Sequence, residues 1–247
     1  MDIYVRGKMD TGDKLSKKTL LENGVLKVSG RLVDASNATL FGTIEYGGES
    51  LAVIYKPIAG ERPLWDFAEG TLANREYASY LVSESAGFHL VPLTILRDGP
   101  FGDGMVQSWI DIDETIDLVA FFETDDPQLR KMALFDAIIN NTDRKIGHLL
   151  PTEDGHLFGC DHGVTFHRED KLRTVLWQWA GEDLSPEEIH TLQNLHTSLK
   201  GPLGEDLANL LTQEEISALH KRVERLLSDK SFPLPSQDWP SVPWPAF

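Results

Sequence analysis

The chain has 247 residues, of which 41% are hydrophobic, and a formal net charge of −16 at pH 7. This length and composition indicate one large globular unit or two lobes that share an interface, and the acidic charge disfavours nucleic acids and anionic membranes as partners. Cys160 is the single cysteine, which excludes an internal disulfide bond. Residues 1–18 are too polar for a signal peptide, and no apolar run approaches the ~20 residues that a membrane span needs. We therefore expect a cytoplasmic protein with no membrane span.

The first half of the chain predicts an antiparallel sheet with one long helix inserted. Apolar and polar side chains alternate in residues 26–33, which is typical of a strand. Gly47-Gly48 predicts a hairpin turn, and the glycine-rich stretch at 99–104 predicts another. The expected elements are a short helix that ends at Gly24, strands at 26–33, 40–46, 51–55, 91–97 and 105–110, and a helix between residues 70 and 87.

The second half of the chain is predicted to be mainly helical. Pro127 suits the first position of one helix, Ser185 suits the N-cap of a later helix, and residues 212–215 have the form of a capping box. The expected helices cover residues 116–122, 127–140, 185–199 and 212–227.

The tail, residues 232–247, carries five prolines together with Trp239, Trp244 and Phe247. Such a proline-rich sequence cannot be helical. It suits either an extended belt packed on the body of the protein or a proline-rich ligand for a partner protein. We favour the belt, because leaving two tryptophans and a phenylalanine in water is costly.

Two acidic residues flank a predicted β-hairpin in the middle of the chain. Short strands at 149–150 and 156–160 are separated by a Thr-Glu-Asp-Gly turn, with Asp143 before the first strand and Asp161 after the second. A tight hairpin brings its two open ends together. Two neighbouring carboxylates are costly unless a cation or an acid–base role accounts for them. The hairpin ends therefore predict a functional site.

These motifs resemble the catalytic centre of the phosphatidylinositol 3-/4-kinase-like group of the protein-kinase-like fold. The first motif runs Asp-Arg-Lys-Ile-Gly-His over residues 143–148, and the second runs Asp-His-Gly over residues 161–163. More narrowly, their wording is similar to that of an uncharacterised actinobacterial kinase-like family. The resemblance is specific over residues 130–180, weaker over 25–110 and absent over 185–247. It implies an α+β, two-lobed fold, with an antiparallel-sheet N-lobe (residues 1–108) and a mainly helical C-lobe (residues 109–247).

The resemblance also implies roles for the residues of these two motifs. Asp143 would accept the proton of the attacking hydroxyl, and Asp161 would bind a metal ion. His148 stands where relatives have a metal-binding Asn, and imidazole suits Mn²⁺ better than Mg²⁺. Arg144 would face a phosphate or pair with Asp161, and Lys145 is a second cation that could face a phosphate.

In the N-lobe the same resemblance implies a nucleotide site. Lys56 would contact the ATP phosphates, with Glu76 as its ion-pair partner and Glu69 as the second choice. Small polar residues between the first two strands replace a glycine-rich phosphate loop, and backbone groups at the end of the last strand would meet the adenine. These candidates are Ser36 and Asn37 for the phosphates, and Val106, Gln107 and Ser108 for the adenine.

The sequence therefore predicts an ATP-dependent kinase that uses ATP and Mg²⁺ or Mn²⁺ and acts on a protein or small-molecule hydroxyl. The net charge argues against a phosphoinositide as the acceptor. Two alternatives stay open. One is a nucleotide-binding pseudokinase with a scaffolding role, which the missing glycine-rich loop and the change to His148 favour. The other is a different transfer from ATP, such as adenylylation.

Overall fold

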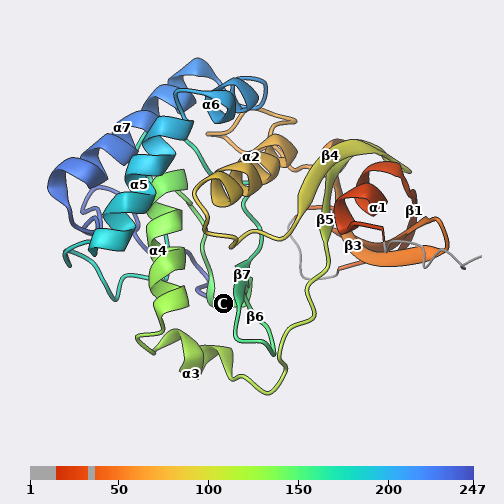
Figure 1. Cartoon of the computed structure of the whole chain (residues 1–247), viewed down its shortest axis with the longest axis horizontal. Coiled ribbons are helices and arrows are strands. Elements are labelled where there is room, and N and C mark those ends of the chain that lie inside the picture. The colour runs from red at the N-terminus through yellow and green to blue at the C-terminus, as the bar shows by residue number, and fades with distance from the viewer. Residues whose placement is uncertain (1–14, 33–36) are drawn as a thin grey trace, which may run out of the picture.

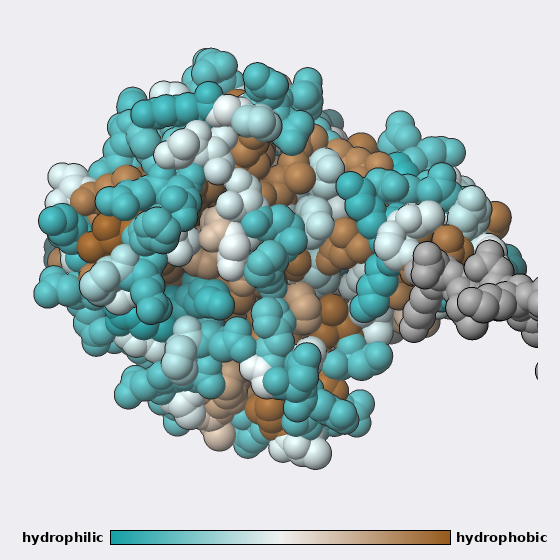
Figure 2. Space-filling model, in the orientation of Figure 1, coloured by the Kyte–Doolittle hydropathy of each residue, from teal (hydrophilic) through white to brown (hydrophobic). Residues whose placement is uncertain are grey.

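The computed structural model describes residues 15–32 and 37–247 and contains two lobes (Figure 1). A five-stranded antiparallel sheet forms one lobe, and the other is mainly helical. The predicted two-lobed α+β fold is therefore confirmed. Hydrophilic residues cover most of the face seen in Figure 2. Within the described residues, no helix combines the length and the apolar character that crossing a bilayer requires.

The sheet has the strand order β1-β2-β3-β5-β4, with every neighbouring pair antiparallel. Gly47 and Gly48 both have positive φ angles and form the predicted turn between β2 and β3. The turn predicted at 99–104 is shorter than expected. Gly104 lies inside β5, where it pairs with Pro57 of β3, and an added Cβ there would stand 2.5 Å from the Lys56 carbonyl oxygen. The strands are β1 (Val25–Arg31), β2 (Leu40–Tyr46), β3 (Glu49–Pro57), β4 (Thr94–Gly99) and β5 (Gly102–Ser108).

One face of the sheet is covered by α1 (Lys17–Asn23), whose Ser16 side chain caps the first turn. Leu20 and Leu21 of this helix pack on apolar side chains of the strands and form the sheet core with them. The strand residues of the sheet core are Leu26, Ile44, Val53, Tyr55, Ile95 and Val106.

Three helices of the helical lobe begin where their capping sequences predicted. Asp126 caps the helix that starts at Pro127, and Ser185 and Thr212 both form capping boxes. The short helix α6, which contains Gly204, was not predicted. The helices are α2 (Leu72–Ser85), α3 (Leu118–Phe122), α4 (Pro127–Ile139), α5 (Pro186–Ser198), α6 (Pro202–Leu207) and α7 (Gln213–Asp229), with 3₁₀ turns η1 (Ile58–Gly60) and η2 (Ile146–His148) and the hairpin strands β6 (Leu149–Pro151) and β7 (Leu157–Gly159).

Helix α2 follows the sheet strand β3 in the chain but shares its core with the helical lobe. Ala78 and Val82 belong to the same cluster of buried residues as Leu134 of α4 and Leu195 of α5. Figure 1 shows α2 beside α5 and α6. The described residues therefore form two separate cores, the sheet core and a helical core that includes α2.

Candidate active site

Lys56 lies at the centre of the site because of its place in β3. Val53 and Tyr55 point into the sheet core, so the alternation of the strand turns Lys56 to the opposite face. There its Nζ lies 2.5 Å from the Glu76 carboxylate and 2.8 Å from the Asp161 carboxylate. The lysine is thus shared between a residue of α2 and a residue that follows β7.

Glu76 fixes this arrangement from a buried position on α2. Its second carboxylate oxygen accepts the His162 backbone N–H at 2.9 Å. One side chain therefore holds both Lys56 and the chain next to Asp161. The predicted partner of Lys56 is confirmed as Glu76, and Glu69 is not the partner.

The ion pair strongly favours the charged forms of Lys56 and Asp161. Burial alone would lower the pKa of Lys56, but the charges of Asp161 and Glu76 outweigh it and raise that pKa above its ordinary value. The same lysine is the main cause of the lowered pKa of Asp161. Asp161 has a positive φ of 61°, a conformation that costs non-glycine residues free energy and is frequent at functional sites.

The hairpin brings His148, at its first open end, beside Asp161, which follows its second strand. Cys160 donates its backbone N–H to the His148 carbonyl, and the His148 Nε2 lies 3.6 Å from the Asp161 carboxylate. Burial lowers the pKa of His148 to about 4, so its imidazole is neutral at pH 7. A neutral imidazole beside an ionised carboxylate is a pair that a divalent cation can accept as ligands.

The donor set fits a metal ion that a phosphate ligand helps to hold. Among the described residues there is no group of three or more His, Cys, Asp or Glu side chains placed to hold a metal by themselves. Mg²⁺ commonly takes one or two carboxylates and completes its shell with water and phosphate oxygens. Asp161 and His148 suit such an open site rather than a closed structural one.

Asp143 lies in the loop between α4 and the hairpin. Its backbone N–H donates to the Asn141 side chain at 3.0 Å, and the Lys145 Nζ lies 3.5 Å from its carboxylate. Burial raises the pKa of Asp143 above the ordinary value, although Lys145 opposes the shift. A raised carboxyl pKa suits a group that accepts a proton near neutral pH.

Arg144 does not occupy the predicted place. Its guanidinium is fully buried and pairs with Asp136 of α4, not with Asp161, and it also donates to the Cys160 carbonyl at 3.0 Å. Its Nη2 lies 2.7 Å from the His162 Nε2. From this buried position, Arg144 therefore holds the loop that carries Asp143 against α4 and against the chain that leads into Asp161. Asp136 was missed, although an acidic residue inside the apolar run of α4 was a signal that it has a buried partner.

The residues predicted to meet the adenine also need a correction. Val106 and Gln107 lie in β5, which pairs with β3 on one edge and with β4 on the other. Ser108 donates its N–H to the Leu93 carbonyl. The backbone groups of Val106 and Gln107 are therefore committed to the sheet, because β5 has a neighbouring strand on both edges.

The candidate phosphate loop is only partly described. Ser36 lies outside the described residues. Asn37 accepts the Arg62 backbone N–H with its side chain and lines a small cavity beside Lys56. Glu61, which the sequence did not single out, lines the same cavity and accepts the N–H groups of Leu72 and Ala73 at the start of α2. An acidic side chain at a helix N-terminus is a favourable arrangement, and it anchors α2 here.

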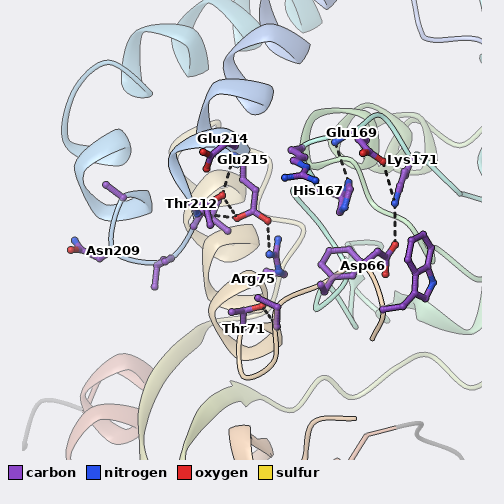
Figure 3. A pocket seen from close by; sticks show the side chains of 17 residues that line it. Asp66, Thr71, Arg75, His167, Glu169, Lys171, Asn209, Thr212, Glu214 and Glu215 are labelled. Atoms are coloured by element: carbon purple, nitrogen blue, oxygen red, sulfur yellow. Dashed lines mark hydrogen bonds and ion pairs between the residues drawn. The ribbon is translucent and has the colours of Figure 1, made fainter. Parts of the chain in front are cut away.

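A larger cavity of about 660 Å³ lies elsewhere, between the loop before α2, the segment after Phe166 and the start of α7 (Figure 3). Arg75 and Glu215 form a buried ion pair at its wall, and Lys171 bonds Asp66 on another side. None of the predicted site residues lines this cavity.

Comparison with known proteins places the chain in a family. No protein-family model matches it. The chain is 43% identical to Protein Rv2133c of Mycobacterium tuberculosis (strain ATCC 25618 / H37Rv), over 92% of this chain and 94% of that protein. The chain belongs to the Rv2133c family.

A solved structure similar to this member of the Rv2133c family is that of the Helicobacter pylori proinflammatory kinase CtkA. The two share 10% sequence identity with a TM-score of 0.47, and the match covers 85% of this chain and 93% of the other. The narrower resemblance to phosphatidylinositol 3-/4-kinases stays a prediction.

Proposed function

We propose that this protein is an ATP-dependent phosphotransferase that acts on a hydroxyl group of a protein or small molecule. The observation that carries the proposal is the position of Lys56, whose amine is bonded to both Glu76 and Asp161. A lysine held by a helix glutamate beside a metal-binding aspartate is the arrangement that kinases use to place ATP phosphates.

In this proposal Lys56 donates to a phosphate oxygen, and Glu76 keeps its amine in place. Asp143 accepts the proton of the acceptor hydroxyl, whose oxygen bonds to the γ-phosphorus while the bond to the bridging β–γ oxygen breaks and ADP leaves. The raised pKa of Asp143 supports its role as the proton acceptor. Arg144 is a positioning residue here, because Asp136 and the Cys160 carbonyl take its donors.

Asp161 and His148 would hold Mg²⁺ or Mn²⁺, which neutralises phosphate charge when it is bound. A nitrogen ligand favours Mn²⁺ over Mg²⁺. We expect ATP to bind more tightly with Mn²⁺, and equal affinity with the two metals would contradict His148 as a ligand.

One contact favours a second candidate, a nucleotide-binding module that does not turn ATP over. The Lys145 backbone N–H points at the His148 Nδ1 at 3.4 Å. If Nδ1 accepts this bond, the neutral imidazole carries its proton on Nε2, the nitrogen that faces Asp161. Metal ligation through Nε2 then needs the other tautomer.

Thermal unfolding with ATP and Mg²⁺ or Mn²⁺ tests nucleotide binding. ATP at about 100 times its dissociation constant should stabilise the wild type by about 2.7 kcal/mol. Asp161→Asn should lose this shift, while Asp125→Asn, at an exposed position, should keep it. The absence of a shift in the wild type with either metal would overturn the proposal.

ADP formation separates the two candidates. Asp143→Asn should keep the ATP-dependent thermal shift but lower ADP formation by about 10²-fold or more, because a proton acceptor contributes on that order. ATP binding with equal, background ADP formation in the wild type and Asp143→Asn would favour the module without turnover.

A further inference from the structure

The end of the chain packs on the loop that carries Asp143. Residues 239–247, called the C-terminal segment below, contain neither helix nor strand and pack on the body of the protein. The Ile146 N–H donates to the Ala246 carbonyl at 2.9 Å. Figure 1 shows the C-terminus beside the hairpin of β6 and β7, which follows this loop. The segment therefore reaches a residue only three positions from Asp143.

Further contacts hold the C-terminal segment at two places in the helical lobe, Gly147 and the stretch from Thr174 to Trp177. The Phe247 ring lies beside Gly147, where an added Cβ would be 3.8 Å from the ring. The Ser241 carbonyl accepts the Thr174 N–H at 3.0 Å and the Trp177 indole N–H at 2.9 Å. Backbone carbonyls of the segment thus receive most of the polar contacts, as in the binding of extended polypeptides.

An aromatic side chain anchors the other end of the segment. The Trp239 ring lies 5.0 Å from the Lys171 ammonium and 6.0 Å from the Arg173 guanidinium. Cations near the face of a tryptophan are attracted to it. The buried indole N–H of Trp239 has no hydrogen-bond partner among the described residues. An unpaired buried donor costs free energy, so this indole N–H weakens the binding of the segment.

We propose that these contacts define a docking surface for extended polypeptides with an aromatic side chain, which the C-terminal segment occupies. The inference rests on the proposed function for its role, because a polypeptide on this surface would bond Ile146, three residues from the proposed proton acceptor Asp143. A polypeptide acceptor would then displace the segment and use the same backbone donors. The docking surface consists of Ile146, Gly147, Lys171, Arg173, Thr174 and Trp177.

Amide hydrogen exchange in the full chain tests the docking directly. In the wild type the Ile146 and Thr174 amides should be protected by their bonds to the segment. Trp239→Ala and Phe247→Ala should each speed exchange at one or both of these amides by about tenfold or more. The Arg144 and Val175 amides, which bond the Arg173 and Arg144 carbonyls instead, are the internal controls.

A fluorescein-labelled peptide of residues 237–247 tests whether the surface accepts a polypeptide in trans. The wild type should bind it weakly, because its own segment competes at a high effective concentration. Trp239→Ala should bind it at least about tenfold more tightly, since its own anchor is lost. Trp244→Ala is the matched control, because this tryptophan lies in the same segment with 89% of its surface exposed. It should behave as the wild type in both measurements.

Unchanged exchange in both anchor variants, or peptide binding that is absent or equal in the wild type and Trp239→Ala, would overturn the docking surface. Neither measurement contains nucleotide. If ATP fails to stabilise the wild type while the exchange and peptide results are as expected, the proposed function fails and the docking surface stands. If ATP binds but amide exchange is unchanged, the docking surface fails and the proposed function stands.

Discussion

The Arg144 guanidinium and the Asp136 carboxylate form an ion pair with both side chains completely buried, at 2.9 Å between Nη2 and Oδ1. Asp136 also accepts a bond from the Asn141 side chain, and Arg144 reaches the Cys160 carbonyl. The pair thus links α4 to both loops that carry the candidate catalytic aspartates. A buried charge that loses its partner is strongly destabilising.

Asp136→Asn should therefore lower the free energy of unfolding by about 3–5 kcal/mol, because it leaves the Arg144 cation buried without a counter-charge. Asp170→Asn is the matched control, since it removes the same charge from an ion pair with Arg225 in which both side chains are about half exposed. That change should cost less than about 1 kcal/mol. Urea unfolding measures both. Similar losses in the two variants would show that burial of the Arg144 pair contributes nothing.

Lys56→Met should also destabilise the protein, by several kcal/mol, because Glu76 is 2% exposed and would lose its cation. Adding Glu76→Gln should recover part of the loss, since the uncompensated charge is then removed. Lys27→Met is the control, as Lys27 and Glu45 pair across two strands of the same sheet with at least half of each side chain exposed. Urea unfolding of both single variants and the double variant gives the interaction free energy between Lys56 and Glu76. Strictly additive losses would contradict a direct Lys56–Glu76 interaction.

His148 should make stability fall in mild acid. Burial lowers its pKa to about 4 in the folded protein, while an unfolded chain protonates it near the ordinary value of about 6.5. Between these pH values the unfolded chain binds more protons, so the contribution is complete above pH ~6.5 and is lost as the pH falls through ~4. The shift corresponds to about 3 kcal/mol.

The measurement is the free energy of urea unfolding between pH 7 and 4. His148→Gln should show a smaller loss than the wild type over this range, with His162 and His220, whose pKa values burial also lowers, contributing to the remainder. His190→Gln, at an exposed position of α5, should keep the wild-type slope. An identical slope in His148→Gln and the wild type would rule out His148 as the source.

Cys160 should react slowly with thiol reagents in the folded protein. Burial raises the pKa of its thiol to about 12, so very little reactive thiolate exists at pH 8. Modification by a disulfide reagent at pH 8 should be at least about a hundredfold slower than in urea. Because the chain has a single cysteine, the colour change reports this site alone. Comparable rates in the two conditions would mean that the strand end opens freely.

Local patterns predicted the parts of the structure that local physics decides. Gly47-Gly48 marked the turn between β2 and β3, and capping residues such as Ser185 and Thr212 marked helix starts correctly. The hairpin brought His148 to Asp161, because a tight turn leaves little freedom to its two ends.

The parts that depended on distant contacts were predicted less well. Nothing in the sequence next to Arg144 names Asp136 as its partner, because the pairing depends on how the loop folds back on α4. The bounds of β5 were also misjudged: it covers Gly102–Ser108 instead of the expected 105–110, because its extent depends on pairing with β3 and β4. The extended tail has no periodic pattern that would indicate which surface it covers.

The Lys56–Glu76 ion pair spans the boundary between the sheet core and the helical core. Tyr55, next to Lys56, is part of the sheet core, whereas Ala78, two residues after Glu76, belongs to the helical core. The boundary between the two cores thus lies between β3 and α2, although these elements are close in the chain. The Lys56–Glu76 ion pair therefore couples the sheet to the helical core from inside the site, alongside the contacts that α2 makes with β4 and β5.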